Sequence, residues 1–303
     1  MNEIIYLRNA LVLATMDEQR REIEHGALLT QGNRILQIGT TAELDAWLKT
    51  HPEHKPSRII DASGCVVTPG LVNCHHHMYQ TLTRSIGTSK GLALFDWLKM
   101  LYQVWAGLTP EAIQISTQVA LAELILSGAT TVADHLYIFP DGCRLEDEIL
   151  PAQAMGIRFH PTRGSMSVGE SAGGLPPDFL VEKEAYILQE SQRLIEAWHD
   201  PEPYSMLRMG LAPCSPFSVS GDLMRESARL ARSYKKIGLH THLAETIDEN
   251  RYCLEKFGKR PIDYAESVEW VGSDVWFAHM VHPDDGEISK LAHTCSGVCH
   301  CPS

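Results

Sequence analysis

The chain has 303 residues, enough for a barrel of alternating strands and helices with a small second domain. Its composition of 44% hydrophobic and 21% charged residues is ordinary for a globular protein and excludes fibrous and disordered classes. Lys and Arg number 26 against 38 Asp and Glu, a formal charge of -12, which argues against a nucleic-acid polymer as partner.

The eight cysteines include no CxxC pair, so zinc-ribbon and disulfide-framework folds are disfavoured. The N-terminus lacks a basic segment followed by an apolar run, and no stretch of about 18 apolar residues occurs. These features predict a soluble, cytoplasmic protein that does not enter a membrane.

Residues 1–66 alternate short β-rich runs with turn signals, which predicts the N-terminal part of a small β-sandwich domain. The expected strands are residues 4–7, 26–30, 34–39, 58–61 and 65–67.

Residues 67–303 change to a rhythm of strand and helix. A helix is expected to begin at Thr109, whose side chain can cap it, and to end at Gly128. Further helices are expected near 181–198, 222–236, 249–257 and 285–293, between strands near residues 72, 130–134, 157–160, 207–211, 238–242, 275–279 and 297–300. Seven such strands predict an α/β fold, a TIM-like (β/α)8 barrel cut after its seventh strand, with chemistry at the C-terminal ends of the strands.

Two histidine pairs with a spacing of two residues are the clearest chemical signal. Side chains two apart on a strand point the same way, so His75 and His77 can offer two imidazoles to one metal ion. His240 and His242 repeat the spacing, and Glu245 follows past the strand end as a candidate proton shuttle. His242 fits a third ligand, whereas His240, deeper in the strand, is equally compatible with a core position.

His279 ends the next apolar strand, where it could contact a metal-bound water. The nitrogen ligands favour Zn²⁺ as the bound divalent ion, with Fe²⁺ as the alternative.

Several segments resemble the strand signatures of the amidohydrolase superfamily, in its branch of mononuclear aminohydrolases. They are residues 69–77, 242–245, 279 and 300–303. Within that branch, residues 75–84, 94–98, 134–137 and 163–171 are most similar to the 8-oxoguanine deaminase group.

The resemblance implies a hydrolytic deaminase of a purine-like heterocycle, with 8-oxoguanine giving urate and ammonia. The alternatives are triazine aminohydrolase or chlorohydrolase activity, a guanine or cytosine type of deaminase, and, least favoured, a non-enzymatic metal-binding protein. The partner would be a small heterocyclic substrate, and a homo-oligomer is left open.

The resemblance also implies a single metal ion. The two-metal amidohydrolases bridge their ions with a carboxylated lysine on the strand that ends here near Pro213, and no Lys occurs between Lys183 and Lys235.

The resemblance further implies roles for individual residues. Glu245 and His279 would be catalytic, the first as proton donor and the second as the group that orients the attacking water. Gln80, Trp105 and Arg163 are candidates for substrate binding, although Gln80 could equally cap a loop and Trp105 could belong to the core.

The family's fourth metal ligand is an Asp at the end of strand eight, and the sequence ends at Ser303 before such a strand. The expectation is that residues 1–303 alone are inactive and poorly soluble.

Overall fold

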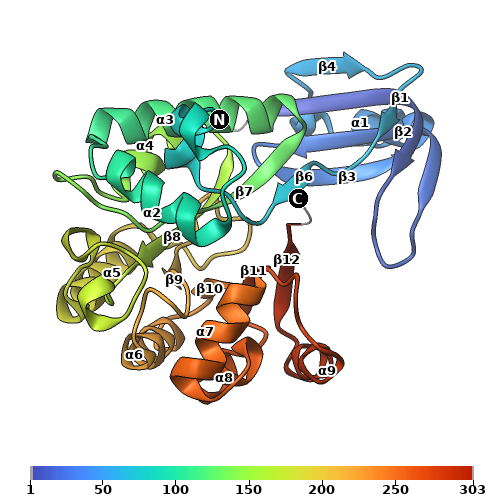
Figure 1. Cartoon of the computed structure of the whole chain (residues 1–303). Coiled ribbons are helices and arrows are strands. Elements are labelled where there is room, and N and C mark those ends of the chain that lie inside the picture. The colour runs from blue at the N-terminus through green and yellow to red at the C-terminus, as the bar shows by residue number, and fades with distance from the viewer. Residues whose placement is uncertain (1–2, 302–303) are drawn as a thin grey trace. The chain divides into compact units, whose positions relative to one another are not determined.

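A computed structural model describes residues 3–301, and the chain divides into two compact units, residues 1–71 and 72–303 (Figure 1). Each unit has its own hydrophobic core.

The smaller unit is built on one five-stranded sheet. Its strand order is β3-β2-β1-β4, with β5 also pairing with β1, and the strands are β1 (Ile4–Ala14), β2 (Glu22–Gln31), β3 (Arg34–Thr40), β4 (Arg58–Asp61) and β5 (Val66–Val67). Helix α1 (Thr41–Thr50) begins at a capping box in which Thr40 and Glu43 bond each other's backbone N–H groups. Leu44 of this helix is buried with strand residues such as Tyr6 and Leu29.

The described part of this unit holds one sheet, and the apolar positions of β1 and β2 pack against α1. This agrees with the predicted small sheet domain, and the sandwich, of which residues 1–66 are expected to form only the N-terminal part, stays a prediction.

The larger unit contains a seven-stranded sheet with the order β12-β11-β10-β9-β8-β7-β6. Its strands are β6 (Leu71–Asn73), β7 (Ala129–Leu136), β8 (Arg158–Ser165), β9 (Gly210–Pro213), β10 (Gly238–Leu243), β11 (Val275–His279) and β12 (Gly297–His300). Its helices are α2 (Leu94–Trp105), α3 (Pro110–Leu126), α4 (Glu146–Met155), α5 (Glu184–Trp198), α6 (Gly221–Arg232), α7 (Ile247–Phe257), α8 (Pro261–Ser267) and α9 (Asp285–Thr294). Neighbouring strands from β7 to β12 pair in parallel, and helices lie on their outer side (Figure 1).

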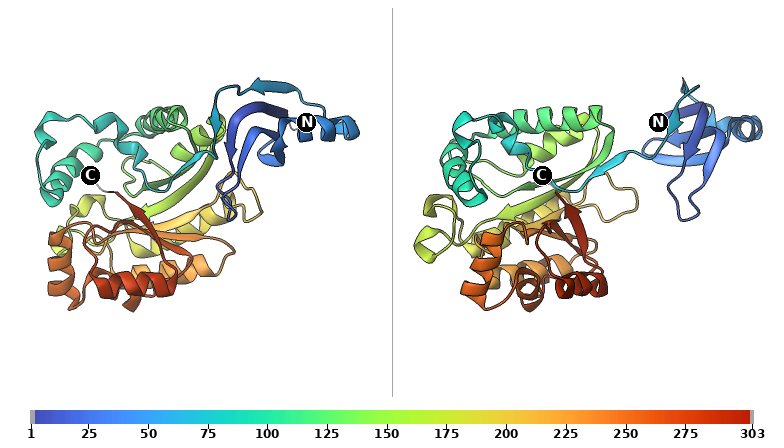
Figure 2. Two further views of the ribbon diagram at one scale, coloured as in Figure 1. Left: turned by 90° about the vertical axis from the view of Figure 1, so that its right-hand side faces the viewer. Right: turned by 45° about the vertical axis from the view of Figure 1, so that its right-hand side comes forward.

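The sheet is curled. The indole N–H of Trp276, in β11, donates to the carbonyl of Cys74, directly after β6, at 3.0 Å, although these strands lie near opposite ends of the sheet order. Figure 2 shows the curvature from two further directions. This arrangement confirms the predicted barrel-type fold, of which the described residues form seven strands.

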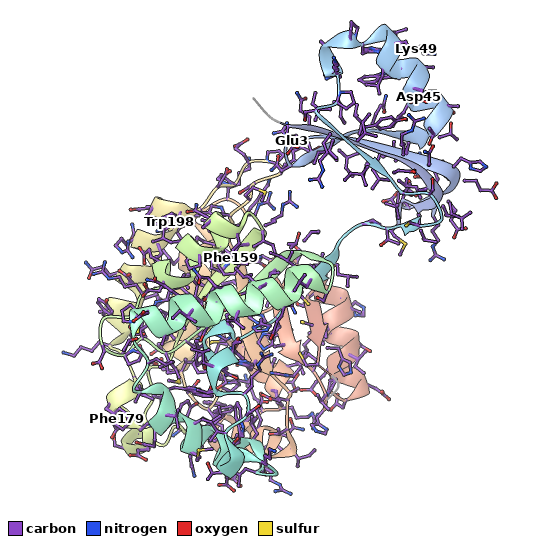
Figure 3. All side chains as sticks on the ribbon, turned by 90° about the horizontal axis from the view of Figure 1, so that it is seen from above. Glu3, Asp45, Lys49, Phe159, Phe179 and Trp198 are labelled. Atoms are coloured by element: carbon purple, nitrogen blue, oxygen red, sulfur yellow. The ribbon has the colours of Figure 1, made fainter. Side chains whose placement is uncertain are left out.

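The elements that carry strong local signals form where the sequence predicts them. Thr109 accepts a hydrogen bond from the N–H of Ala112 at the start of α3, and Phe159 of β8 is 1% exposed. The strand expected at 207–211 lies instead at Gly210–Pro213, after an isolated bridge between Phe159 and Leu207. Figure 3 contrasts the interior position of Phe159 with Phe179, which is 63% exposed at the edge of the unit.

Across residues 3–301, no helix combines the length and apolar character that a membrane crossing requires.

Candidate metal centre and cavity

Four histidines from three parts of the larger unit converge at the C-terminal ends of its strands. His75 and His77 follow β6, His135 lies on β7 and His242 on β10. Each offers one ring nitrogen, and these nitrogens all lie within 4.8 Å of one another. The Nε2 atoms of His77 and His242 are 2.9 Å apart.

Backbone carbonyls fix which nitrogen of each ring carries the proton. The Nδ1 atom of His77 lies 2.7 Å from the carbonyl oxygen of His135, and Nδ1 of His242 lies 2.7 Å from that of Cys214. A carbonyl only accepts hydrogen bonds, so both Nδ1 atoms carry the hydrogen and both Nε2 atoms present a lone pair.

Burial keeps these imidazoles neutral. It lowers the pKa of His77 to about 3 and holds the pKa values of His75 and His242 well below the ordinary value. Two lone pairs then face each other across 2.9 Å, and the buried Nε2 of His75 has no hydrogen-bond partner among the described residues. Neutral nitrogens in this arrangement are suited to a divalent cation.

His135 is a member of this cluster to which the sequence gave no role. Its Nε2 lies 2.9 Å from the carbonyl of Ala212, and its buried Nδ1 has no hydrogen-bond partner among residues 3–301. The sequence analysis identified metal ligands by pairs of histidines two residues apart, and His135 has no histidine at that spacing. The curled sheet brings it to the other three.

Glu245 and His279 lie beside the histidine cluster. His279 Nε2 is 3.5 Å from Glu245 Oε2, and the His279 ring stacks on His242 with centroids 5.2 Å apart. Burial and the nearby Glu249 carboxyl raise the pKa of Glu245 to about 8, whereas burial lowers the pKa of His279 to about 4. At neutral pH the pair therefore consists of a carboxylic acid and a neutral imidazole.

The backbone at both strand ends is unusual. His279 has φ of 75° and Ala244, just before Glu245, has φ of 52°. Residues other than glycine seldom adopt this left-handed region, and such strain gathers at functional sites.

A cavity of about 340 Å³ adjoins the cluster. Its lining is mostly apolar and aromatic and consists of His77, Gln80, Leu92, Leu94, Trp97, Leu98, Tyr102, Tyr137, Cys214, Phe217, His242, Glu245 and His279. Its volume and lining are typical of a site for a small organic ligand.

Of the three residues predicted to bind substrate, Gln80 lines the cavity, whereas Trp105 and Arg163 are not among its described lining residues. Gln80 lines the cavity, and its amide nitrogen donates to the hydroxyl of Tyr79 at 3.2 Å, which holds the side chain in place. Trp105 is not among the described residues that line the cavity. It is fully buried, and its indole N–H donates to Thr83. Its ring contacts the ring of Trp97 edge to face, with centroids 5.5 Å apart.

Arg163 is likewise absent from the described lining of the cavity. Its guanidinium forms a two-pronged ion pair with Glu182, at 2.7 and 2.8 Å, and lies over the ring of Phe139. The sequence predicted that the positive charge of Arg163 would contact a ligand, but in the structure the carboxylate of Glu182 pairs with it.

Glu249 is a further residue that the sequence reasoning missed. It is fully buried in the first turn of α7, where its carboxylate accepts the backbone N–H groups of Ala244 and Glu245 at 2.9 and 2.8 Å. Thr246 and Glu249 have the spacing of a capping box, a visible signal for a helix start. In the structure the carboxylate instead ties down the turn that presents Glu245.

Comparisons with known proteins agree with this architecture. Residues 66–303 match the model of the amidohydrolase family. The chain belongs to this family. It is 44% identical over 98% of its length to 8-oxoguanine deaminase of Pseudomonas aeruginosa, and 37% identical over 81% to hydroxydechloroatrazine ethylaminohydrolase of Pseudomonas sp. strain ADP.

Among solved amidohydrolase-like structures, atrazine chlorohydrolase from Arthrobacter aurescens TC1, crystallised with zinc, superimposes with a TM-score of 0.89 at 30% identity. The match covers 98% of this chain and 65% of that one. The chain spans 64% and 51% of the lengths of the two Pseudomonas relatives.

The Glu249 carboxyl generates a pH-dependent prediction. Replacing Glu249 by Ala leaves two backbone N–H groups without their acceptor, which costs roughly 1–3 kcal/mol for each buried group. Because burial raises the folded-state pKa of Glu249 to about 7 from 4.5, this residue stabilises the fold most at low pH, and that contribution declines as pH rises between these values.

Urea unfolding of the wild type and Glu249→Ala should therefore show a larger loss of stability at pH 5 than at pH 8. Glu255→Ala, on an exposed position of the same helix, is the control and should change little at either pH. Equal stability of Glu249→Ala and wild type at pH 5 would contradict the role assigned to this carboxyl.

Proposed function

We propose that the complete protein containing residues 1–303 is a cytoplasmic, zinc-dependent deaminase that hydrolyses 8-oxoguanine to urate and ammonia. The main support is the 44% identity to 8-oxoguanine deaminase over nearly the whole chain. The cavity beside the histidine cluster supplies a site of suitable size and chemistry for a flat heterocycle.

His75, His77 and His242 would hold the metal ion through their Nε2 atoms. The orphaned Nε2 of His75 and the facing nitrogens of the other two fit a divalent ion, and neutral imidazoles favour zinc. When bound, such an ion acts as a Lewis acid and makes a water molecule acidic enough to attack at neutral pH.

Glu245 would move the protons of the reaction. Burial and the Glu249 carboxyl raise the pKa of its carboxyl, which favours the protonated form, and that form can donate to the ring nitrogen beside the amino-bearing carbon. Water adds to that carbon, the C–N bond breaks, and the amino group leaves as ammonia after gaining a proton. Glu249 keeps the carboxyl in place through the backbone of the preceding turn.

His279 and Gln80 would orient the reactants. His279, neutral and 3.5 Å from Glu245, can hold the attacking water by a hydrogen bond. The amide of Gln80 is tethered to Tyr79 by its nitrogen, so its oxygen can accept from a ring N–H.

The charge of the cavity indicates an uncharged ligand. The described lining contains no Lys or Arg, and Arg163 is paired with Glu182. A phosphate or carboxylate on the substrate would lose its hydration without gaining a Lys or Arg partner from this lining. A free base is therefore favoured over a nucleotide.

A triazine substrate is the second candidate. It is supported by the 37% identity to hydroxydechloroatrazine ethylaminohydrolase and by the structural similarity to atrazine chlorohydrolase. The same acid and metal ligands would serve, with an alkylamino group or a halide as the leaving group.

The metal proposal predicts one tightly held ion in the complete protein. Elemental analysis should give about one zinc per chain, and His242→Ala should lose it because one of three nitrogen ligands is gone. His293→Ala, exposed on α9, is the matched control and should keep the metal. Two ions per chain, or full metal content in His242→Ala, would contradict the proposed site.

If Glu245 acts as an acid and not as a ligand, its substitution should lower turnover without changing the metal content. Glu245→Gln should retain the metal, since the carboxyl is not a ligand, and should lower kcat by a factor on the order of 100 or more. Loss of zinc from this variant would show that the carboxylate coordinates the ion instead.

Substrate choice tests the function itself. The complete enzyme should prefer 8-oxoguanine to guanine in kcat/KM, because a cavity that pairs with the 8-oxo and N7–H groups leaves a buried partner unsatisfied when they are missing. Isocytosine should be a secondary substrate. Comparable values for guanine and 8-oxoguanine would contradict this reading, and faster release of an alkylamine from a hydroxytriazine would favour the second candidate.

A further inference from the structure

His240 lies directly beneath the histidine cluster and makes two strong hydrogen bonds through its ring. It is 1% exposed, in β10, in register with Trp276 of β11. Its Nδ1 lies 2.8 Å from the backbone carbonyl of Trp276, and its Nε2 lies 2.8 Å from Nδ1 of His75. The ring also stacks on the Trp276 indole, with centroids 4.6 Å apart and planes at 18°.

The carbonyl of Trp276 sets the direction of both bonds. Since a carbonyl only accepts, Nδ1 of His240 carries the hydrogen. No carboxylate makes a hydrogen bond to the His240 ring among the described residues, so a charged ring would be buried without a counter-ion, and the neutral form is favoured. Its Nε2 is therefore an acceptor, which takes the Nδ1 hydrogen of His75 and leaves the Nε2 lone pair of His75 free.

We propose that His240 is a positioning residue that fixes the tautomer and orientation of His75 for metal binding. The proposal rests on the metal site proposed above. His77 and His242 obtain the same constraint from backbone carbonyls, which no substitution removes. His75 obtains it from a side chain, so this constraint can be removed by mutation.

Trp276 constrains both the ring of His240 and the backbone next to His75. Besides accepting from His240 and stacking on it, it donates its indole N–H to the carbonyl of Cys74, the residue before His75. The backbone and the ring of the ligand are thus held by adjacent groups on β10 and β11.

The test compares His240→Gln with His240→Met in the complete protein. The two side chains have similar length and shape, but the amide oxygen of Gln can accept the Nδ1 hydrogen of His75, whereas the thioether is a much weaker acceptor. The measurement is zinc affinity by competition with a chromophoric chelator, together with the thermal unfolding midpoint of the metal-free protein. We expect His240→Met to bind zinc about 10–100-fold more weakly than wild type and His240→Gln to recover most of that loss.

His160→Met is the packing control. His160 is a half-buried neighbour of the same indole, with ring centroids 5.0 Å apart, and makes no hydrogen bond to His75. It should leave zinc affinity nearly unchanged.

Equal zinc affinity of His240→Met and wild type would overturn the proposal, as would equal losses in His240→Met and His160→Met, which indicate packing alone. Equal weakening in the Gln and Met variants would also overturn it, because the acceptor would then be irrelevant. Failure of the wild type to bind zinc would instead refute the proposed metal site itself.

Discussion

The carbonyl oxygens that accept the Nδ1 protons of the histidines are the constraint on which the candidate site depends. His135, Cys214 and Trp276 supply them, the first two to His77 and His242 and the third to His75 through His240. Each bond places a hydrogen on the outer nitrogen and a lone pair on the inner one. The inner nitrogens are consequently close together, neutral and without protein hydrogen donors, which is an unfavourable arrangement without a cation.

The curled parallel sheet makes this arrangement available. The accepting carbonyls lie on β7, directly after β9 and on β11, each beside a strand or loop that carries a histidine. Trp276 lies near the start of β11, whereas His135 and Cys214 lie at the C-terminal ends of β7 and β9, where barrel enzymes place their chemistry. The same end holds the strained turns at Ala244 and His279 and the buried carboxyl of Glu249, which set the position of the proposed acid. Burial then gives the two neighbouring titratable groups opposite shifts, with Glu245 protonated and His279 neutral.

Local patterns in the sequence predicted the parts of the fold that local interactions determine. Thr109 caps α3, and the alternation of His75 with His77 and of His240 with His242 follows from strand geometry. Helices α1, α2, α4 and α8 were not predicted. The residues before α2 and α4, Ala93 and Leu145, make no side-chain cap, and α4 contains Pro151, normally a sign of a break. The capping box of α1 was a local signal that the sequence analysis did not use.

Long-range pairing explains the remaining differences at the site. The sequence offered Arg163 and Trp105 as ligand contacts, but Arg163 is neutralised by Glu182 and Trp105 bonds to Thr83, partners 19 and 22 residues away. His135 joins the cluster only because the sheet curls, and the hydrogen bond of His240 to His75 spans 165 residues. Neither spacing nor composition contains that information.

The central claim concerns the protonation of the histidine rings before any metal binds, and ¹⁵N NMR of the metal-free protein tests it most directly. Two-bond correlations between ring nitrogens and carbon-bound hydrogens distinguish the two neutral tautomers from the charged ring, and single substitutions assign the signals. At pH 6 to 7, His75, His77 and His242 should all be neutral with the hydrogen on Nδ1. Hydrogen on Nε2, or charged rings at these positions, would contradict the account.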